Sequence, residues 1–189
     1  MRIGLCGSHR TGKTTLAMAL SGRLRVPFLK TGTSEVFRQS GLDPAMPMTF
    51  EKRMWIQDRV LDAAEAVWRG AEGGFVTDRT PVDMMAYALA DVRGDTPADF
   101  SRMAGYLGRC FESANSFFDV LVVVQPGIEL VYEEGKAALN LAYMEHLNYL
   151  MLGLAGDERL TARVVRLGRG AASVEERVKE VLEGLEGGA

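Results

Sequence analysis

The stretch Gly7-Ser-His-Arg-Thr-Gly-Lys-Thr14 decides the fold, because it follows the spacing G-x-x-x-x-G-K-[ST] in full. A polyphosphate needs many hydrogen-bond donors in a small volume, and successive backbone amides supply them only where the chain curls tightly. Glycine at positions 7 and 12 permits that curl, since it has no side chain and tolerates positive φ. An apolar run precedes the stretch and a helical pattern follows it, which is the context that the motif requires. The stretch therefore predicts a phosphate-binding loop (P-loop).

The motif also assigns candidate ligands for a nucleotide and a metal ion. A helix that begins near Lys13 directs the positive end of its dipole toward a bound anion. Lys13 is expected to reach the β- and γ-phosphates, and the hydroxyl of Thr14 to bind Mg²⁺. The predicted cofactors are therefore ATP and Mg²⁺. The candidate nucleotide-binding residues are Gly7, Ser8, His9, Arg10, Thr11, Gly12, Lys13, Thr14 and Thr15.

Strand and helix patterns alternate along the rest of the chain. The apolar patterns predict strands over residues 1–6, 26–30, 74–78, 119–124 and 163–167. Helical patterns cover residues 13–25, 50–68, 81–91, 98–113, 136–154 and 174–185. This alternation favours the α/β class, a three-layer sandwich with a parallel sheet of about five strands.

Composition and charge restrict what the protein does. The 189 residues suit a single domain, 1–189, and a hydrophobic content of 47% is that of an ordinary globular protein. The net charge of -3 predicts no general attraction to nucleic acid or to anionic membranes. Cys6 and Cys110 form no disulfide framework, and Cys6 lies in an apolar run typical of a buried packing residue. With no signal peptide and no long apolar run, we expect a cytoplasmic protein without a membrane partner.

Asp78 and Arg79 follow the third predicted strand. Ligands of open α/β sheets bind at the carboxyl ends of strands, so these two side chains are expected to face the same edge as the P-loop. Asp78 is there a candidate metal ligand or proton acceptor, and Arg79 a candidate clamp for phosphate oxygens. In the alternative interpretation Asp78 only caps the helix that starts at Pro81, and Arg79 is a solvated charge.

The sequence from Asp78 to Tyr87, Asp-Arg-Thr-Pro-Val-Asp-Met-Met-Ala-Tyr, resembles the Asp-Arg-x-x-x-Ser-x-x-Ala-Tyr stretch of thymidylate kinases. The order of elements is similar over nearly the whole chain. The resemblance implies a P-loop kinase fold, acceptor-binding helices at about 33–72 and a lid at about 125–147, where Lys136 occurs without an arginine. Arg10 stands where one thymidylate kinase class has its P-loop arginine, which implies a contact with the γ-phosphate. Arg79 would hold the acceptor or its phosphate.

The chain also departs from that family around the acceptor. His9 replaces an aspartate, Asp83 replaces a serine, and the stretch 30–35 after the second strand holds no arginine, so the grip on an acceptor monophosphate differs. Glu35 follows the second strand, where nucleoside kinases and nicotinamide riboside kinases often place a carboxylate near the acceptor hydroxyl. It is a candidate general base, and the alternative of a surface glutamate remains open.

The sequence is similar, too, to phage kinases that phosphorylate 5-hydroxymethyluracil in DNA. DNA as a partner requires a basic strip, for which the candidates are Lys30, Arg38, Lys52, Arg53 and Arg59; the same residues also fit a solvated helix face. We therefore expect an ATP- and Mg²⁺-dependent transfer of the γ-phosphate to a nucleoside, a nucleotide or a modified base, with 5-hydroxymethyluracil in DNA preferred.

Two kinds of alternative remain open. The first is a small-molecule kinase of the thymidylate or nicotinamide riboside type. The second is a nucleotide-binding switch or ATPase, but the apolar strand 120–124 ends in Gln125-Pro126 without the carboxylate that such proteins often carry. A homodimer is a further expectation, through an exposed face at Met84-Met85 or Tyr106-Leu107.

Overall fold

A computed structural model describes residues 1–44, 46–129 and 140–187, and its centre is an all-parallel sheet. The strands are β1 (Arg2–Cys6), β2 (Phe28–Leu29), β3 (Phe75–Thr77), β4 (Val120–Val124) and β5 (Arg163–Leu167). Their order is β2-β3-β1-β4-β5. After β1 the chain first forms β2 and β3 on one flank of β1, and later β4 and β5 on its other flank. The carboxyl end of β1 therefore lies between those of β3 and β4, which is where such sheets bind ligands.

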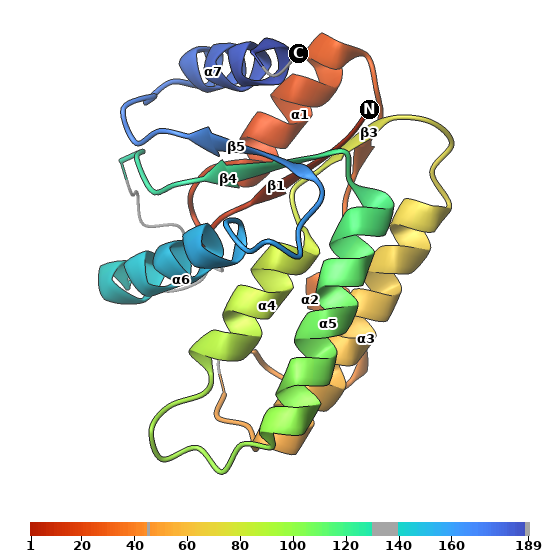
Figure 1. Cartoon of the computed structure of the whole chain (residues 1–189), viewed down its shortest axis with the longest axis vertical. Coiled ribbons are helices and arrows are strands. Elements are labelled where there is room, and N and C mark those ends of the chain that lie inside the picture. Colours follow the sequence, from red (N-terminus) through yellow and green to blue (C-terminus); the bar gives the residue numbers. More distant parts are fainter. Residues whose placement is uncertain (45, 130–139, 188–189) are drawn as a thin grey trace.

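Helices cover both faces of the sheet (Figure 1). The helices are α1 (Lys13–Leu24), α2 (Thr33–Gln39), α3 (Phe50–Arg69), α4 (Pro81–Ala90), α5 (Phe100–Phe117), α6 (Leu141–Leu154) and α7 (Val174–Glu186). Figure 1 shows α1 and α7 on one face and α4, α5 and α6 on the other, with α3 beside α5. None of the described helices is both long enough and apolar enough to cross a bilayer.

The core divides into two layers because side chains of a strand alternate between its faces. In β4, Val120, Val122 and Val124 pack toward α1 and α7, while Leu121 and Val123 pack toward the other layer. All five are buried, so the strand reads as an unbroken apolar run. This arrangement confirms the predicted α/β sandwich and its parallel sheet.

Several predicted boundaries shift. The second strand is only Phe28–Leu29, at the edge of the sheet, since the Pro27 ring cannot donate a ladder hydrogen bond. The helix predicted over 98–113 runs from Phe100 to Phe117 and starts at an Asp99 cap. Residues 130–139 of the predicted lid, 125–147, lie outside the described residues, and Lys136 is among them.

The predicted dimer face is wrong for three of its four residues, and the fourth, Leu107, is half-buried. Met84, Met85 and Tyr106 are 3%, 0% and 0% exposed, so they cannot form a face that pairs two copies. The physical reason is that α4 lies between α3, α5 and α6 and is therefore apolar nearly all round.

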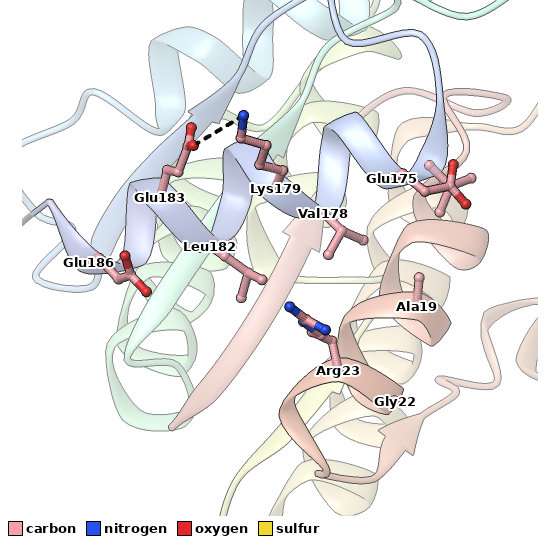
Figure 2. A pocket seen from close by; sticks show the side chains of 10 residues that line it. Ala19, Gly22, Arg23, Glu175, Val178, Lys179, Leu182, Glu183 and Glu186 are labelled. Atoms are coloured by element: carbon pink, nitrogen blue, oxygen red, sulfur yellow. Dashed lines mark ion pairs between the residues drawn. The ribbon is translucent and has the colours of Figure 1, made fainter.

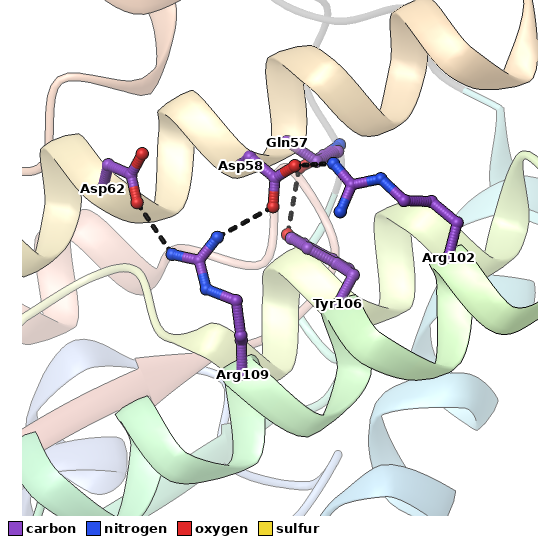
Figure 3. A network of polar contacts seen from close by, with 6 residues as sticks. All are labelled: Gln57, Asp58, Asp62, Arg102, Tyr106 and Arg109. Carbon is purple, nitrogen blue, oxygen red and sulfur yellow. Dashed lines mark hydrogen bonds and ion pairs between the residues drawn. The ribbon is translucent and has the colours of Figure 1, made fainter.

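Ion pairs join the long helices α3 and α5 (Figure 3). The carboxylate of Asp58 on α3 accepts from both Arg102 and Arg109 of α5. Arg109 also donates to Asp62 at 2.7 Å, so one guanidinium bridges two turns of α3. Exposed pairs contribute little energy each, but this network fixes the register of the two helices. The ion pairs therefore fix how α3 and α5 lie against each other.

Candidate active site

The loop between β1 and α1 has the tight curl that the motif predicts. A Cβ on Gly7 would lie 2.4 Å from the Val124 carbonyl oxygen, so only glycine fits beside β4. Gly12 caps α1 with φ 79°, and Arg10 is also left-handed, with φ 60°. A non-glycine residue in this region costs about 1 kcal/mol or more. The backbone at Arg10 is therefore strained, and such strain is common in functional loops.

The side chain of Lys13 reaches back across the loop. Its Nζ donates to the carbonyl oxygens of Gly7 and Ser8, each at 2.7 Å, and only 8% of the residue is exposed. Burial lowers the pKa of Lys13 to about 8, although the nearby Asp83 carboxylate opposes the shift. The ammonium group thus lies inside the loop that the motif assigns to phosphate.

The two predicted metal ligands are brought together. The Thr14 hydroxyl, in the first turn of α1, donates to Oδ2 of Asp78, which follows β3. Because β1 and β3 are parallel neighbours, their carboxyl ends place these groups side by side. A hydroxyl and a carboxylate suit Mg²⁺, which binds oxygen and keeps several waters. No cluster of three or more histidine, cysteine or acidic residues that would suit another metal occurs in the described parts of the chain.

Asp83 belongs to the site, although in the sequence it stood out only as a departure from the thymidylate kinase stretch. Its Oδ1 accepts from the Gly7 amide at 3.1 Å, and its Oδ2 accepts from the amide and hydroxyl of Thr80 at 3.0 Å. The side chain is completely buried, which raises its pKa, while Lys13 and Arg79 favour the carboxylate. The spacing Thr80-x-x-Asp83 with Pro81 between was the available signal, because it is a capping box. Asp83 therefore connects the P-loop to the start of α4.

Arg79 lies beside an aromatic group. Its Cζ is 5.4 Å from the centroid of the Tyr87 ring, and the Tyr87 hydroxyl is 3.5 Å from Nδ1 of His9. The His9 ring in turn is 6.0 Å from that of Tyr143 on α6. Burial works against the charge of Arg79, but Asp83, Tyr87 and Asp78 more than offset it and raise the pKa of the guanidinium. The P-loop, α4 and α6 thus meet around a stable positive charge.

Glu35 is engaged within its own helix. It lies on α2, where its carboxylate accepts from Nε of Arg38 at 2.8 Å and from Gln39 at 2.6 Å. The hydrogen bonds from Arg38 and Gln39 lower the pKa of Glu35. Its partners among the described residues all belong to α2. The structure therefore does not join Glu35 to the P-loop cluster, and its role as a base stays a prediction.

The remaining P-loop residues differ in exposure. Ser8 and Thr11 are buried, and the Thr11 hydroxyl donates to the Ser8 carbonyl oxygen at 2.9 Å. Thr14 and Thr15 are exposed at the start of α1, and His9 and Arg10 are half-buried. The buried Thr11 hydroxyl thus braces the loop, while Thr14 and Thr15 are exposed at its end.

We expect the affinity for ATP to fall at alkaline pH. A bound phosphate favours charged Lys13, so above its pKa of about 8 binding must take up a proton. The Kd for ATP should therefore rise about tenfold from pH 7 to pH 9. Cys6 and Tyr87 have raised pKa values and titrate above this window. Calorimetry at pH 8.5 in two buffers of different ionisation enthalpy would measure the proton uptake, and a pH-independent Kd would contradict the assignment.

The fold is shared with solved P-loop kinases. Over 99% of this chain and 99% of the other, it superposes on deoxyadenosine kinase from M. mycoides with a TM-score of 0.64 and 18% identity. Thymidylate kinase from Ehrlichia chaffeensis gives a TM-score of 0.66 at 11% identity, covering 98% of both chains. The NadR protein in complex with NR gives 0.67 at 16% identity, covering 98% of this chain but 49% of NadR. Identities this low establish the fold alone.

At the level of sequence, no curated protein matches. Residues 2–113 match a family described as an AAA domain, AAA_28. The matched stretch is more than half of the chain and includes the P-loop, Asp78, Arg79 and Asp83. The chain therefore belongs to the AAA_28 family of AAA domains and has the fold of a P-loop kinase.

Proposed function

We propose that this protein is a kinase that transfers the γ-phosphate of ATP to a hydroxyl of a nucleoside or nucleotide. The observation that carries the proposal is the contact between Thr14 and Asp78, which joins the phosphate loop to the Asp78-Arg79 end of β3. A phosphate cradle, a carboxylate and an arginine at one sheet edge are the parts that phosphoryl transfer requires. The fold neighbours named as deoxyadenosine kinase and thymidylate kinase support the same class of reaction.

Each group has a role in this proposal. The loop amides and Lys13 hold the β- and γ-phosphates, and Arg10 contacts the γ-phosphate as charge develops on it. Mg²⁺, held by Thr14 and Asp78, neutralises phosphate charge when it is bound. In this proposal Asp78 also accepts the proton of the acceptor hydroxyl, while Arg79 holds the acceptor. Such catalysis depends on alignment of the reacting groups and needs no covalent intermediate.

A free nucleoside or nucleotide is a better-supported acceptor than DNA. Of the proposed basic strip, Arg53 is paired with Asp91 at 2.6 Å and Arg38 with Glu35, while Arg59 lies over the Trp55 ring. Charges already neutralised by carboxylates release fewer counterions from a phosphate backbone. The finer candidate, 5-hydroxymethyluracil in DNA, therefore belongs in the acceptor panel as one member among several. Helices α2 and α3 are proposed to bind the acceptor.

Substitutions distinguish the two candidate bases. We expect Asp78→Asn to lower kcat about 10²-fold or more, because it removes a charge in contact with the P-loop hydroxyl. Glu35→Gln is expected to lower kcat less than tenfold, since Arg38 and Gln39 already occupy that carboxylate. Steady-state kinetics with the best acceptor would measure both. A larger loss in Glu35→Gln than in Asp78→Asn would reverse the assignment.

The test of the proposed function is transfer of label from γ-labelled ATP with Mg²⁺. The acceptors are deoxyadenosine, thymidine, thymidylate, nicotinamide riboside, 5-hydroxymethyl-deoxyuridine and its monophosphate, and DNA with or without 5-hydroxymethyluracil. Label on one free nucleoside or nucleotide supports the proposal and names the substrate. Label on modified DNA alone would move the acceptor to the finer candidate. Slow hydrolysis of ATP that no acceptor changes would favour the nucleotide-binding switch.

A further inference from the structure

Arg177 lies on α7 and reaches the P-loop from behind. Its Nη1 donates to the carbonyl oxygen of Thr11 at 2.6 Å, across 166 residues of sequence, and its Nε donates to that of Ala171 at 2.8 Å. Arg177 is only 2% exposed. One buried guanidinium thus connects the P-loop with the segment between β5 and α7.

The contact with Thr11 fixes a peptide plane of the P-loop. In a trans peptide the carbonyl oxygen and the following amide hydrogen point in opposite directions. Holding the Thr11 oxygen on the α7 side therefore turns the Gly12 amide hydrogen toward the opposite side of the loop. A Cβ on Gly12 would lie 3.4 Å from Nη1 of Arg177, so the guanidinium packs directly against this residue. Arg177 thereby controls the orientation of an amide at the start of α1.

Arg177 forms no ion pair within the described part of the chain, although the Glu180 carboxylate lies close enough to favour its charge. None of the ion pairs there includes it, and its Nη2 is buried without a hydrogen-bond acceptor. Burial lowers the pKa of the guanidinium, with Glu180 acting against the shift. A buried charge that forms no ion pair is unfavourable, and an anion bound nearby relieves that cost. The P-loop is the adjacent place where the motif predicts such an anion.

We propose that Arg177 is a positioning residue for polyphosphate binding. It orients the Thr11–Gly12 peptide and supplies a desolvated positive charge behind the loop. The inference rests on the proposed nucleotide binding but not on the identity of the acceptor. It also predicts that the contribution of Arg177 depends on the phosphates of the ligand, since both effects act at the P-loop.

The test compares Mg-ATP with inorganic tripolyphosphate as ligands in titration calorimetry. Removing a hydrogen-bonded buried charge should weaken binding of both ligands about tenfold or more in Arg177→Gln. Arg177→Lys keeps the charge but cannot donate to two carbonyls in the same way, so an intermediate loss is expected. The matched control is Lys179→Gln on the same helix. The Lys179 side chain is 76% exposed and pairs with Glu183. It points away from α1, at the rim of a groove between α1 and α7 (Figure 2). Lys179→Gln should bind both ligands as the wild type does.

A kinetic readout separates positioning from general loss of structure. With a measurable acceptor, Arg177→Gln should raise KM for ATP about tenfold while kcat at saturating ATP changes less than threefold. Wild-type affinity for tripolyphosphate in Arg177→Gln would overturn the inference, even if ATP binds more weakly, because the effect of Arg177 would then not act on the phosphates. If Arg177→Gln does not fold, Arg177→Lys decides by the same criterion. A wild type that binds both ligands but phosphorylates no acceptor would reject the proposed function and leave this inference standing.

Discussion

Lys13→Ala should lower kcat/KM for ATP-dependent transfer about 10³-fold, the largest single effect we expect in this protein. Its ammonium group donates to the carbonyl oxygens of Gly7 and Ser8, within the loop that the motif assigns to the phosphates. Arg177 cannot replace it, since it approaches from behind the loop and donates to the Thr11 carbonyl oxygen. The measurement is transfer of label from γ-labelled ATP under initial-rate conditions.

The loss should not come from unfolding. Burial lowers the pKa of Lys13 to about 8, so the folded protein disfavours this charge at neutral pH and its removal should not lower Tm. Lys179→Ala, on the exposed face of α7, is the control and should retain full activity. If Lys13→Ala kept a tenth of the activity or more, the reaction would have to occur away from the P-loop.

The parts of the fold that local patterns specify were predictable. The apolar run of β4 and the strand 163–167 occur as expected, because buried parallel strands read directly as short apolar segments. The P-loop was predictable for another reason, since its spacing is fixed by the size of a polyphosphate. Thr14 and Asp78 meet because two parallel strands end at one edge, and the order of elements already implied that edge.

Contacts between distant segments were not predictable. The bond from Arg177 to Thr11 spans 166 residues, and no periodicity or motif links the two positions. The burial of Met84 and Met85 depends on how many helices surround α4. The sequence of a single helix gives little indication of that number. Glu35 stood in the expected region, but its partners depend on the short helix α2, which is not among the helices that the apolar patterns predicted.

Asp83→Asn is the second substitution with a large expected effect. The carboxylate accepts three hydrogen bonds, from the Gly7 amide and from the amide and hydroxyl of Thr80. An asparagine has one oxygen, so its NH₂ group would face donors in a completely buried place. Burial raises the pKa of Asp83, which means that the buried charge is itself unfavourable. Removing that charge offsets only part of the loss. We expect the free energy of unfolding to fall by about 3 kcal/mol and Tm by roughly 6 to 12 °C.

The matched control is Asp99→Asn, the exposed cap of α5, where asparagine is as good a cap as aspartate and Tm should stay unchanged. Stability alone does not show that Asp83 acts on the site, so a pH profile supplies the second readout. Asp83 raises the pKa of Lys13 through space, and without it Lys13 should lose its proton at lower pH. In Asp83→Asn the alkaline loss of ATP affinity should therefore begin below pH 8, while Asp99→Asn keeps the wild-type profile. An unshifted profile in a destabilised Asp83→Asn would mean that Asp83 supports the fold and has no effect on the phosphate-binding lysine.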